Sequence, residues 1–161
     1  MKNRFLLLLL VGITYLSADV KYNFKSEFTF PWWRSMNLLN KEPIESDAHN
    51  AYIDIYVNDI AKPSYINMHK KFDEGSIIIK PLYTGAKREM LARLVIMMKM
   101  PEGYDSENGD WWYGVYDEYG VEGWYQGKIK SCITCHKMVK ESDYLFTESV
   151  MEDIHLQNSI K

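Results

Sequence analysis

Cysteine is scarce in this sequence, which has 161 residues and only two cysteines, Cys132 and Cys135. Two cysteines so close together exclude a disulfide-rich scaffold, because such scaffolds need several bridges between distant segments. A structural zinc site would need four ligands, normally with a second Cys or His pair. His49, His69 and His155 are scattered along the chain and form no such pair. The cysteines that could serve as ligands or attachment points are therefore grouped near residue 132.

Long apolar runs are also missing. One apolar run covers residues 5–13, which is about half of the ~20 residues that span a bilayer. Lys2 and Arg4 precede this run, and Ser17 and Ala18 follow it as a small-residue cleavage site. This order is typical of a secretory signal peptide, so we expect residues 1–18 to be one, with a membrane anchor as the alternative.

Basic runs do not exceed a dipeptide, and the net charge is −3. Acidic and basic residues are interspersed, so nucleic acid is not an expected partner. Residues 19–161 are enough for a single domain with a hydrophobic core.

What the sequence does contain is the run Cys-Ile-Thr-Cys-His at residues 132–136. This run is the attachment signal of a covalent c-type haem. On a helical turn, Cys132, Cys135 and His136 lie on one face, where the sulfurs can form thioethers with the porphyrin. His136 is then the proximal iron ligand. Because such haems are attached outside the bacterial cytoplasm, the motif and the signal peptide together predict a periplasmic protein.

A redox pair or a disulfide is the alternative for the two cysteines. A thioredoxin-type pair belongs at the end of a strand in a βαβ unit. The region before Cys132 is instead rich in turns, with Gly120, Gly123 and Gly127. The sequence favours one covalent haem c and leaves the redox pair as the lesser alternative.

Alternation of apolar and polar residues predicts a mainly β-sheet body. We expect strands at residues 51–57, 76–83, 91–100 and 111–117, with a fifth within 119–125. Pro81 cannot donate a backbone hydrogen bond, so it predicts that the second strand ends at a sheet edge or a bulge. Residues 101–110 form a polar loop with turn signals.

Helices are expected on either side of these strands. Helical periodicity covers residues 60–72, with Pro63 in the first turn. Ser131 is placed to cap the helical turn of the haem motif. A loop or short helix with packed tryptophans is expected within 19–50, and a strand or loop leading into an amphipathic helix within 142–156. The predicted class is α+β, with an antiparallel sheet of about five strands flanked by helices and the haem motif near the C-terminal end.

Six segments in this order resemble the cytochrome P460 family, which includes the β-sheet type of cytochrome c′. They are residues 53–61, 74–80, 95–99, 103–116, 131–136 and 143–146. The third and fourth contain Val-Ile-Met-Met-Lys and Gly-Tyr-Asp-Ser-Glu-Asn-Gly-Asp-Trp-Trp-Tyr-Gly-Val-Tyr, and the resemblance covers about residues 50–147.

The resemblance implies an antiparallel sheet, a homodimer and one high-spin haem ligated by the motif histidine alone. In P460 members a sheet lysine is also crosslinked to the porphyrin, and the enzyme oxidises hydroxylamine. In cytochrome c′ members the crosslink is absent, and the haem binds nitric oxide or similar small ligands.

Lys80 best matches the crosslinking lysine, although Pro81 follows where the family often has an acidic residue. That proline predicts a bend that could displace Lys80 from the haem. Hydroxylamine oxidation also needs a distal base, for which Glu102, Asp105 and Glu107 in the polar loop are the candidates. The same residues also fit a solvated acidic loop.

The sequence thus favours a periplasmic monohaem cytochrome with a five-coordinate iron, a small gaseous or nitrogenous ligand and a periplasmic electron-transfer partner. The first alternative is P460-type hydroxylamine oxidation. The second is an electron carrier with a sixth ligand such as Met97 or His69. Phe72, Tyr56 and Trp111 are candidate distal caps, or ordinary core residues.

Overall fold

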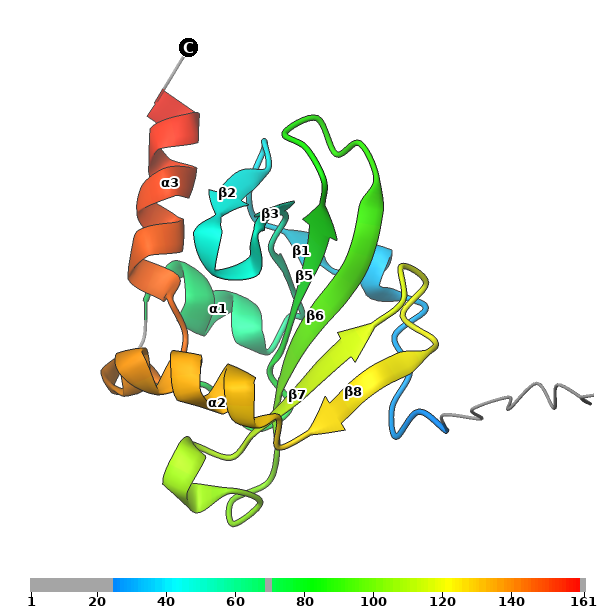
Figure 1. Cartoon of the computed structure of the whole chain (residues 1–161). Coiled ribbons are helices and arrows are strands. Elements are labelled where there is room, and N and C mark those ends of the chain that lie inside the picture. The colour runs from blue at the N-terminus through cyan, green and yellow to red at the C-terminus, as the bar shows by residue number, and fades with distance from the viewer. Residues whose placement is uncertain (1–24, 69–70, 160–161) are drawn as a thin grey trace, which may run out of the picture.

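The computed structural model describes residues 25–68 and 71–159 (Figure 1). The expected signal peptide, residues 1–18, and the candidate ligand His69 lie outside the described residues. Within them, no helix is both long enough and apolar enough to cross a membrane.

Strands of the described chain form one eight-stranded antiparallel sheet. The main path of neighbours runs β1-β4-β5-β6-β7-β8, and β3 pairs with both β2 and β5. The strands are β1 Asn37–Leu38, β2 Ile44–Ser46, β3 Ala51–Ile53, β4 Tyr56–Val57, β5 Ile77–Tyr83, β6 Leu91–Lys99, β7 Trp111–Tyr116 and β8 Gly123–Gly127.

Three α-helices accompany the sheet and lie on one side of it (Figure 1). They are α1 Ala61–Ile66, α2 Lys130–His136 and α3 Thr147–Ser159. Single turns and short stretches of 3-10 helix occur as η1 Trp33–Ser35, η2 Asp47–His49, η3 Ser106–Asn108 and η4 Lys137–Ser142. The predicted α+β class with an antiparallel sheet is confirmed, although the described residues contribute eight strands rather than about five.

Pro81 lies inside the sheet rather than at an edge, and of the two predicted alternatives, an edge or a bulge, the structure has the bulge, at the next residues of β5. β5 pairs with β6 along its length, with Pro81 opposite Leu94, and an irregularity falls between Leu82 and Tyr83. On its other side β5 meets β3 and β4, which are two halves of the strand predicted at 51–57. The interruption at Asp54 lies beside Pro81, where the Asp54 backbone N–H donates to the Pro81 carbonyl. Pro81 is tolerated inside the sheet because this interruption leaves no ladder hydrogen bond for its missing N–H to donate.

The helix predicted over 60–72 is shorter than expected. α1 ends at Ile66, and Met68 has a φ of +52°, which a continuing helix does not allow. Ser131 is not a cap, because α2 begins at Lys130 after Ile129 and has no side-chain cap. At the C-terminal end, a turn and loop at residues 143–146 lead into α3, so the predicted loop followed by a helix is confirmed.

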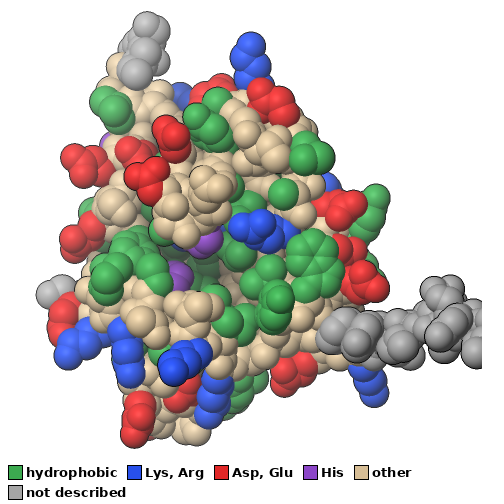
Figure 2. Space-filling model, viewed as in Figure 1, with side chains coloured by type: hydrophobic (Ala, Val, Ile, Leu, Met, Phe, Trp, Pro, Cys, Tyr) green, Lys and Arg blue, Asp and Glu red, His purple; other side chains and the backbone are tan. Residues whose placement is uncertain are grey.

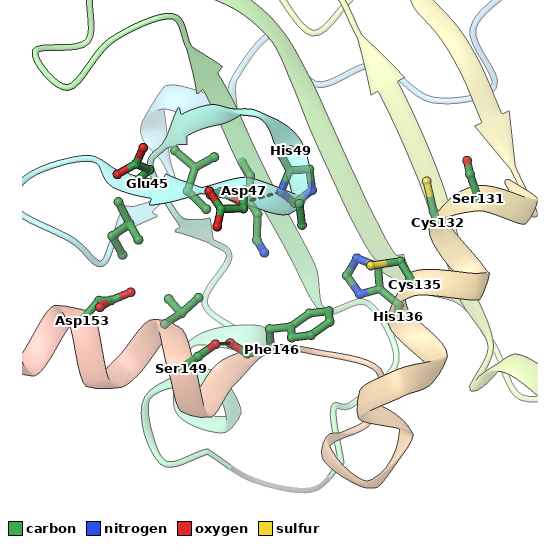
Figure 3. Close-up of a pocket in the computed structure, with 16 residues that line it drawn as sticks. Glu45, Asp47, His49, Ser131, Cys132, Cys135, His136, Phe146, Ser149 and Asp153 are labelled. Carbon is green, nitrogen blue, oxygen red and sulfur yellow. Dashed lines mark hydrogen bonds between the residues drawn. The ribbon is translucent and has the colours of Figure 1, made fainter.

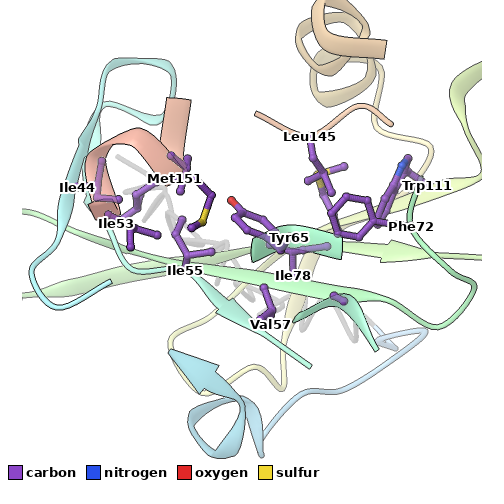
Figure 4. Packing of buried hydrophobic residues seen from close by; sticks show 14 of the residues in the cluster. Ile44, Ile53, Ile55, Val57, Tyr65, Phe72, Ile78, Trp111, Leu145 and Met151 are labelled. Carbon is purple, nitrogen blue, oxygen red and sulfur yellow. The ribbon is translucent and has the colours of Figure 1, made fainter. Parts of the chain in front are cut away.

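The main hydrophobic core lies between the sheet and the helices (Figure 4). Alternate residues of the central strands, such as Ile78, Met97 and Trp111, face this core together with Tyr65 and Met151. A second cluster packs on the opposite face of the sheet, where Ile79, Ile96 and Trp112 contact the N-terminal aromatics Phe30 and Trp33. Because successive side chains of a strand point to opposite faces of the sheet, the central strands contribute to two cores, one on each face.

Candidate functional site

The two cysteines and the histidine of the motif meet at one cavity. α2 places Cys132, Cys135 and His136 on one face, and all three line a cavity of about 370 Å³ (Figure 3). The cavity is enclosed by α2, α3, β5 and the segment around η2, and it opens at the molecular surface as a hollow between hydrophobic side chains (Figure 2). Both thiols are free, and burial raises the pKa of Cys132. The three residues of the motif thus line one cavity.

His136 is held in a fixed orientation. Its Nδ1 lies 2.6 Å from the carbonyl oxygen of Tyr144, and a carbonyl only accepts, so Nδ1 carries the proton. The unprotonated Nε2 is therefore the nitrogen free to bind iron. The ring lies between Tyr113 and Phe146, with centroid distances of 5.6 and 5.5 Å. Burial, with the charge of Lys80, lowers the pKa of His136 to about 4, which keeps it neutral and able to ligate.

The carbonyl that orients His136 belongs to a rigid turn. Asp143 and Tyr144 both have positive φ angles, +51° and +64°. The Asp143 carboxylate accepts bonds from Lys99 Nζ at 2.6 Å and from the Phe72 backbone N–H at 2.7 Å. Trp111 Nε1 donates to the Asp143 carbonyl at 2.9 Å. The turn that positions the proximal histidine is thus tied to β6, β7 and the chain before β5.

Lys80 faces the same cavity from the middle of the sheet. Cross-strand pairing aligns Lys80 with Val95 and Val95 with Val115, so these side chains share the helix-facing side. The Lys80 side chain lines the cavity and the residue is only 6% exposed. Within the described residues it makes no ion pair. Burial lowers its pKa to about 8, so a neutral amine is readily available.

His49 is the cavity residue that the sequence did not reveal. It ends η2, in the connection between β2 and β3, and lines the cavity opposite α2 (Figure 3). Its Nδ1 shares a hydrogen bond of 2.9 Å with the Ser46 hydroxyl. Burial, followed by the charges of Lys80 and His136, lowers the pKa of His49 to about 4. No motif marks it, because it lies far from the cysteines in sequence.

The acidic residues predicted as distal bases do not reach this cavity. Glu102, Asp105 and Glu107 lie in the β6–β7 loop, and none of them lines it. Asp105 instead accepts a bond from Asn108 within the loop, and the Glu107 carbonyl accepts one from the Tyr144 hydroxyl. The acidic residues that do line the cavity are Glu45, Asp47 and Asp153.

The remaining candidates occupy different surroundings. Met97 is a core residue that also lines a smaller neighbouring cavity of about 80 Å³, together with His49, Lys80 and His136. Phe72, Tyr56 and Trp111 line neither of these two cavities. Phe72 and Trp111 pack on each other in the main core, and Tyr56 packs on Trp33.

The residues present fit a haem. The cavity has the size of a cofactor site, and its walls include the apolar Ile44, Ile53 and Val150 beside both thiols. The buried Tyr113 hydroxyl, next to His136, has no hydrogen-bond partner among the described residues. The part of the chain that the structure describes also contains no group of three or more His, Cys, Asp or Glu side chains that could hold a metal ion, as a zinc site would need.

Comparison with known protein families also indicates a haem protein. The family model described as Cytochrome P460 matches residues 32–147. The chain belongs to the cytochrome P460 family. The P460 assignment makes it a haem protein, and the positions of Cys132 and Cys135 agree with covalent attachment. No curated protein matched the chain.

Proposed function

We propose that this P460-family chain carries one haem c with a five-coordinate iron that binds small ligands such as nitric oxide. The observation that carries the proposal is the convergence of Cys132, Cys135 and His136 on one cavity, with the His136 Nδ1 fixed by the Tyr144 carbonyl. The bound haem would supply an iron centre for ligand binding and electron transfer.

The residues around the cavity have separate tasks in this proposal. Cys132 and Cys135 anchor the porphyrin through thioethers, and His136 provides the proximal nitrogen. Phe146, directly before α3, and Val150, in its first turn, supply apolar surface that limits water beside the haem. Met97, a candidate sixth ligand, is packed in the main core and only 6% exposed. Met97 is absent from the wall of the large cavity that holds both thiols, which favours an open sixth position over a methionine-ligated electron carrier.

A second candidate function is P460-type oxidation of hydroxylamine, and the position of Lys80 favours it. A buried lysine without an ion pair, whose pKa is lowered to about 8, is suited to form a bond as the neutral amine. Bonding to a porphyrin carbon would replace one N–H and one C–H by a C–N bond and release two protons and two electrons, which an added two-electron oxidant such as a peroxide would accept. Pro81 does not turn Lys80 away from the cavity.

Export to the periplasm, a periplasmic electron-transfer partner and a homodimeric state remain part of the proposal. They rest on the sequence motif, the expected signal peptide at residues 1–18 and the family resemblance. The compartment is testable by expressing the full chain with and without residues 1–18 and measuring covalent haem in each fraction.

Electronic spectra of the purified ferrous protein test these functions together. A high-spin spectrum that changes on addition of nitric oxide supports the five-coordinate proposal, whereas a low-spin spectrum contradicts it. A Soret band moved far to the red indicates the crosslink. After proteolysis, a Lys80 peptide still joined to the haem peptide is the second sign of the crosslink, and the control is Lys80→Arg. A normal five-coordinate spectrum in His136→Ala would contradict the proximal assignment, and the exposed control His155→Ala should keep the wild-type spectrum.

A further inference from the structure

Two imidazoles face each other across the candidate haem cavity. His136 enters from α2 and His49 from the β2–β3 connection, and both line the large cavity and the smaller one beside it (Figure 3). Each ring has its Nδ1 engaged, by the Tyr144 carbonyl for His136 and by the Ser46 hydroxyl for His49. In both rings, Nε2 is therefore the nitrogen left for the cavity.

The position of His49 is fixed by its hairpin. Ser46 pairs with Ala51 at the end of the β2–β3 ladder, so the connection between them is short. η2 fills this connection with one 3-10 turn, and Asn50 closes it with a φ of +48°. The Ser46–His49 bond then joins the strand end to the imidazole. The ring is consequently held at the cavity wall by local structure as well as by packing.

We propose that His49 is the distal residue of the haem site and that its Nε2–H donates a hydrogen bond to a ligand bound on the open side of the iron. The inference rests on the proposed five-coordinate haem. A hydroxyl that donates to Nδ1 leaves the ring proton on Nε2, which is the tautomer that the proposal requires. Glu102, Asp105 and Glu107 are absent from the cavity wall, and the carboxylates that do line it are Glu45, Asp47 and Asp153.

The surroundings of His49 suit a donor better than a cation. Burial and the nearby charge of Lys80 favour the neutral ring. Ile44 and Ile53 line the same cavity as apolar side chains, and Asp47, in the same turn η2 as His49, adds a carboxylate. A neutral N–H in such a setting holds an electron-rich ligand atom more strongly than it would in water.

Carbon monoxide bound to the ferrous protein is the probe, because its stretching frequency falls when a neighbouring group donates a hydrogen bond to it. We expect His49→Leu to raise the C–O stretching frequency and to speed nitric oxide dissociation about three- to tenfold, the size of one hydrogen bond. His49→Gln keeps an N–H donor and should give intermediate values. Ser46→Ala removes the anchor and should broaden the C–O band. His155→Leu, an exposed histidine on α3, is the matched control and should leave both quantities unchanged.

The outcomes separate this inference from the function on which it rests. If the wild-type protein is five-coordinate and binds carbon monoxide, but His49→Leu behaves as His155→Leu, the role of His49 is wrong and the proposed function stands. If the wild-type protein is low-spin and His49→Leu makes it high-spin, His49 is an iron ligand, which overturns both. A far-ultraviolet circular dichroism spectrum and a urea midpoint close to those of the wild-type protein show that each variant has folded.

Discussion

Replacing Asp143 with asparagine removes the charge at the centre of the turn that positions His136. The Asp143 carboxylate and the Lys99 side chain are 8% and 11% exposed, and Lys99 Nζ lies 2.6 Å from the nearer carboxylate oxygen. Asparagine has the same size and can still accept the bond from the Phe72 backbone N–H. The main loss is therefore the ion pair with Lys99.

The expected cost follows from burial. Removing one partner of a buried pair leaves the other charge without compensation, which typically costs about 3–5 kcal/mol. Because the asparagine side chain would still offer a carbonyl oxygen to the ammonium, we expect the lower end of this range, about 3 kcal/mol of unfolding free energy. Glu141→Gln is the control, since its ion pair with Lys140 is long and exposed and should contribute less than about 0.5 kcal/mol.

Urea denaturation of the haem-bearing protein measures this cost, with a double-mutant cycle to isolate the pair. Lys99→Met combined with Asp143→Asn should be less destabilising than the sum of the single variants, by at least about 1 kcal/mol. The Asp143→Asn protein should also show a weaker iron–imidazole stretch, because the Tyr144 carbonyl is less firmly held against His136. A cost below about 1 kcal/mol, or strict additivity with Lys99→Met, would refute the reasoning.

Three further substitutions test other parts of the fold. Gly109→Ala should cost about 2 kcal/mol or more in urea denaturation, because φ is +72° and the new Cβ would meet the Tyr144 ring; an unchanged midpoint contradicts this. Arg88→Ala leaves the fully buried Asp54 without its 2.8 Å partner, so we expect it to lower the unfolding free energy by about 2 kcal/mol. The control is Lys87→Ala, at an exposed position, which should change it very little. In a haem-free variant with both cysteines changed to alanine, Lys80→Met should raise the urea midpoint, because a pKa lowered from 10.5 to about 8 indicates a burial cost of about 3 kcal/mol; a lower midpoint would show that the amine has a stabilising partner.

The sequence predicted those parts of the site that are close together in the chain. Cys132, Cys135 and His136 lie within one helical turn, so their common face follows from helix geometry alone. The central strands β5, β6 and β7 were likewise predictable from alternation of side chains. Local periodicity reveals both features in the sequence, although the strands are completed by pairing with one another.

The rest of the site depends on contacts between distant segments. His49 and Lys80 join His136 only because β3 pairs with β5 and α2 packs over the same side of the sheet. The β2–β3 hairpin has strands of three residues each, too short for an alternating pattern to show. Pro81 shows the same dependence on distant segments. Its missing N–H allowed a sheet edge to be predicted, but the proline is accommodated inside the sheet because the neighbouring strand is interrupted at Asp54. Pairing between segments, which no local pattern encodes, decided each case.

The three basic residues at the cavity indicate what the site is suited to hold. His49, Lys80 and His136 are each buried enough for the pKa to fall, and Lys80 has no acidic partner among the described residues. Unpaired basic groups around a cavity lower the stability of the empty fold, because burial penalises their charge and the cavity lacks packing contacts. His49 and His136 each have one ring nitrogen hydrogen-bonded, to Ser46 and to Tyr144, and a group that fills the cavity would supply a partner for the other nitrogen. The same three residues are therefore better explained by a bound cofactor and its ligand than by the requirements of folding.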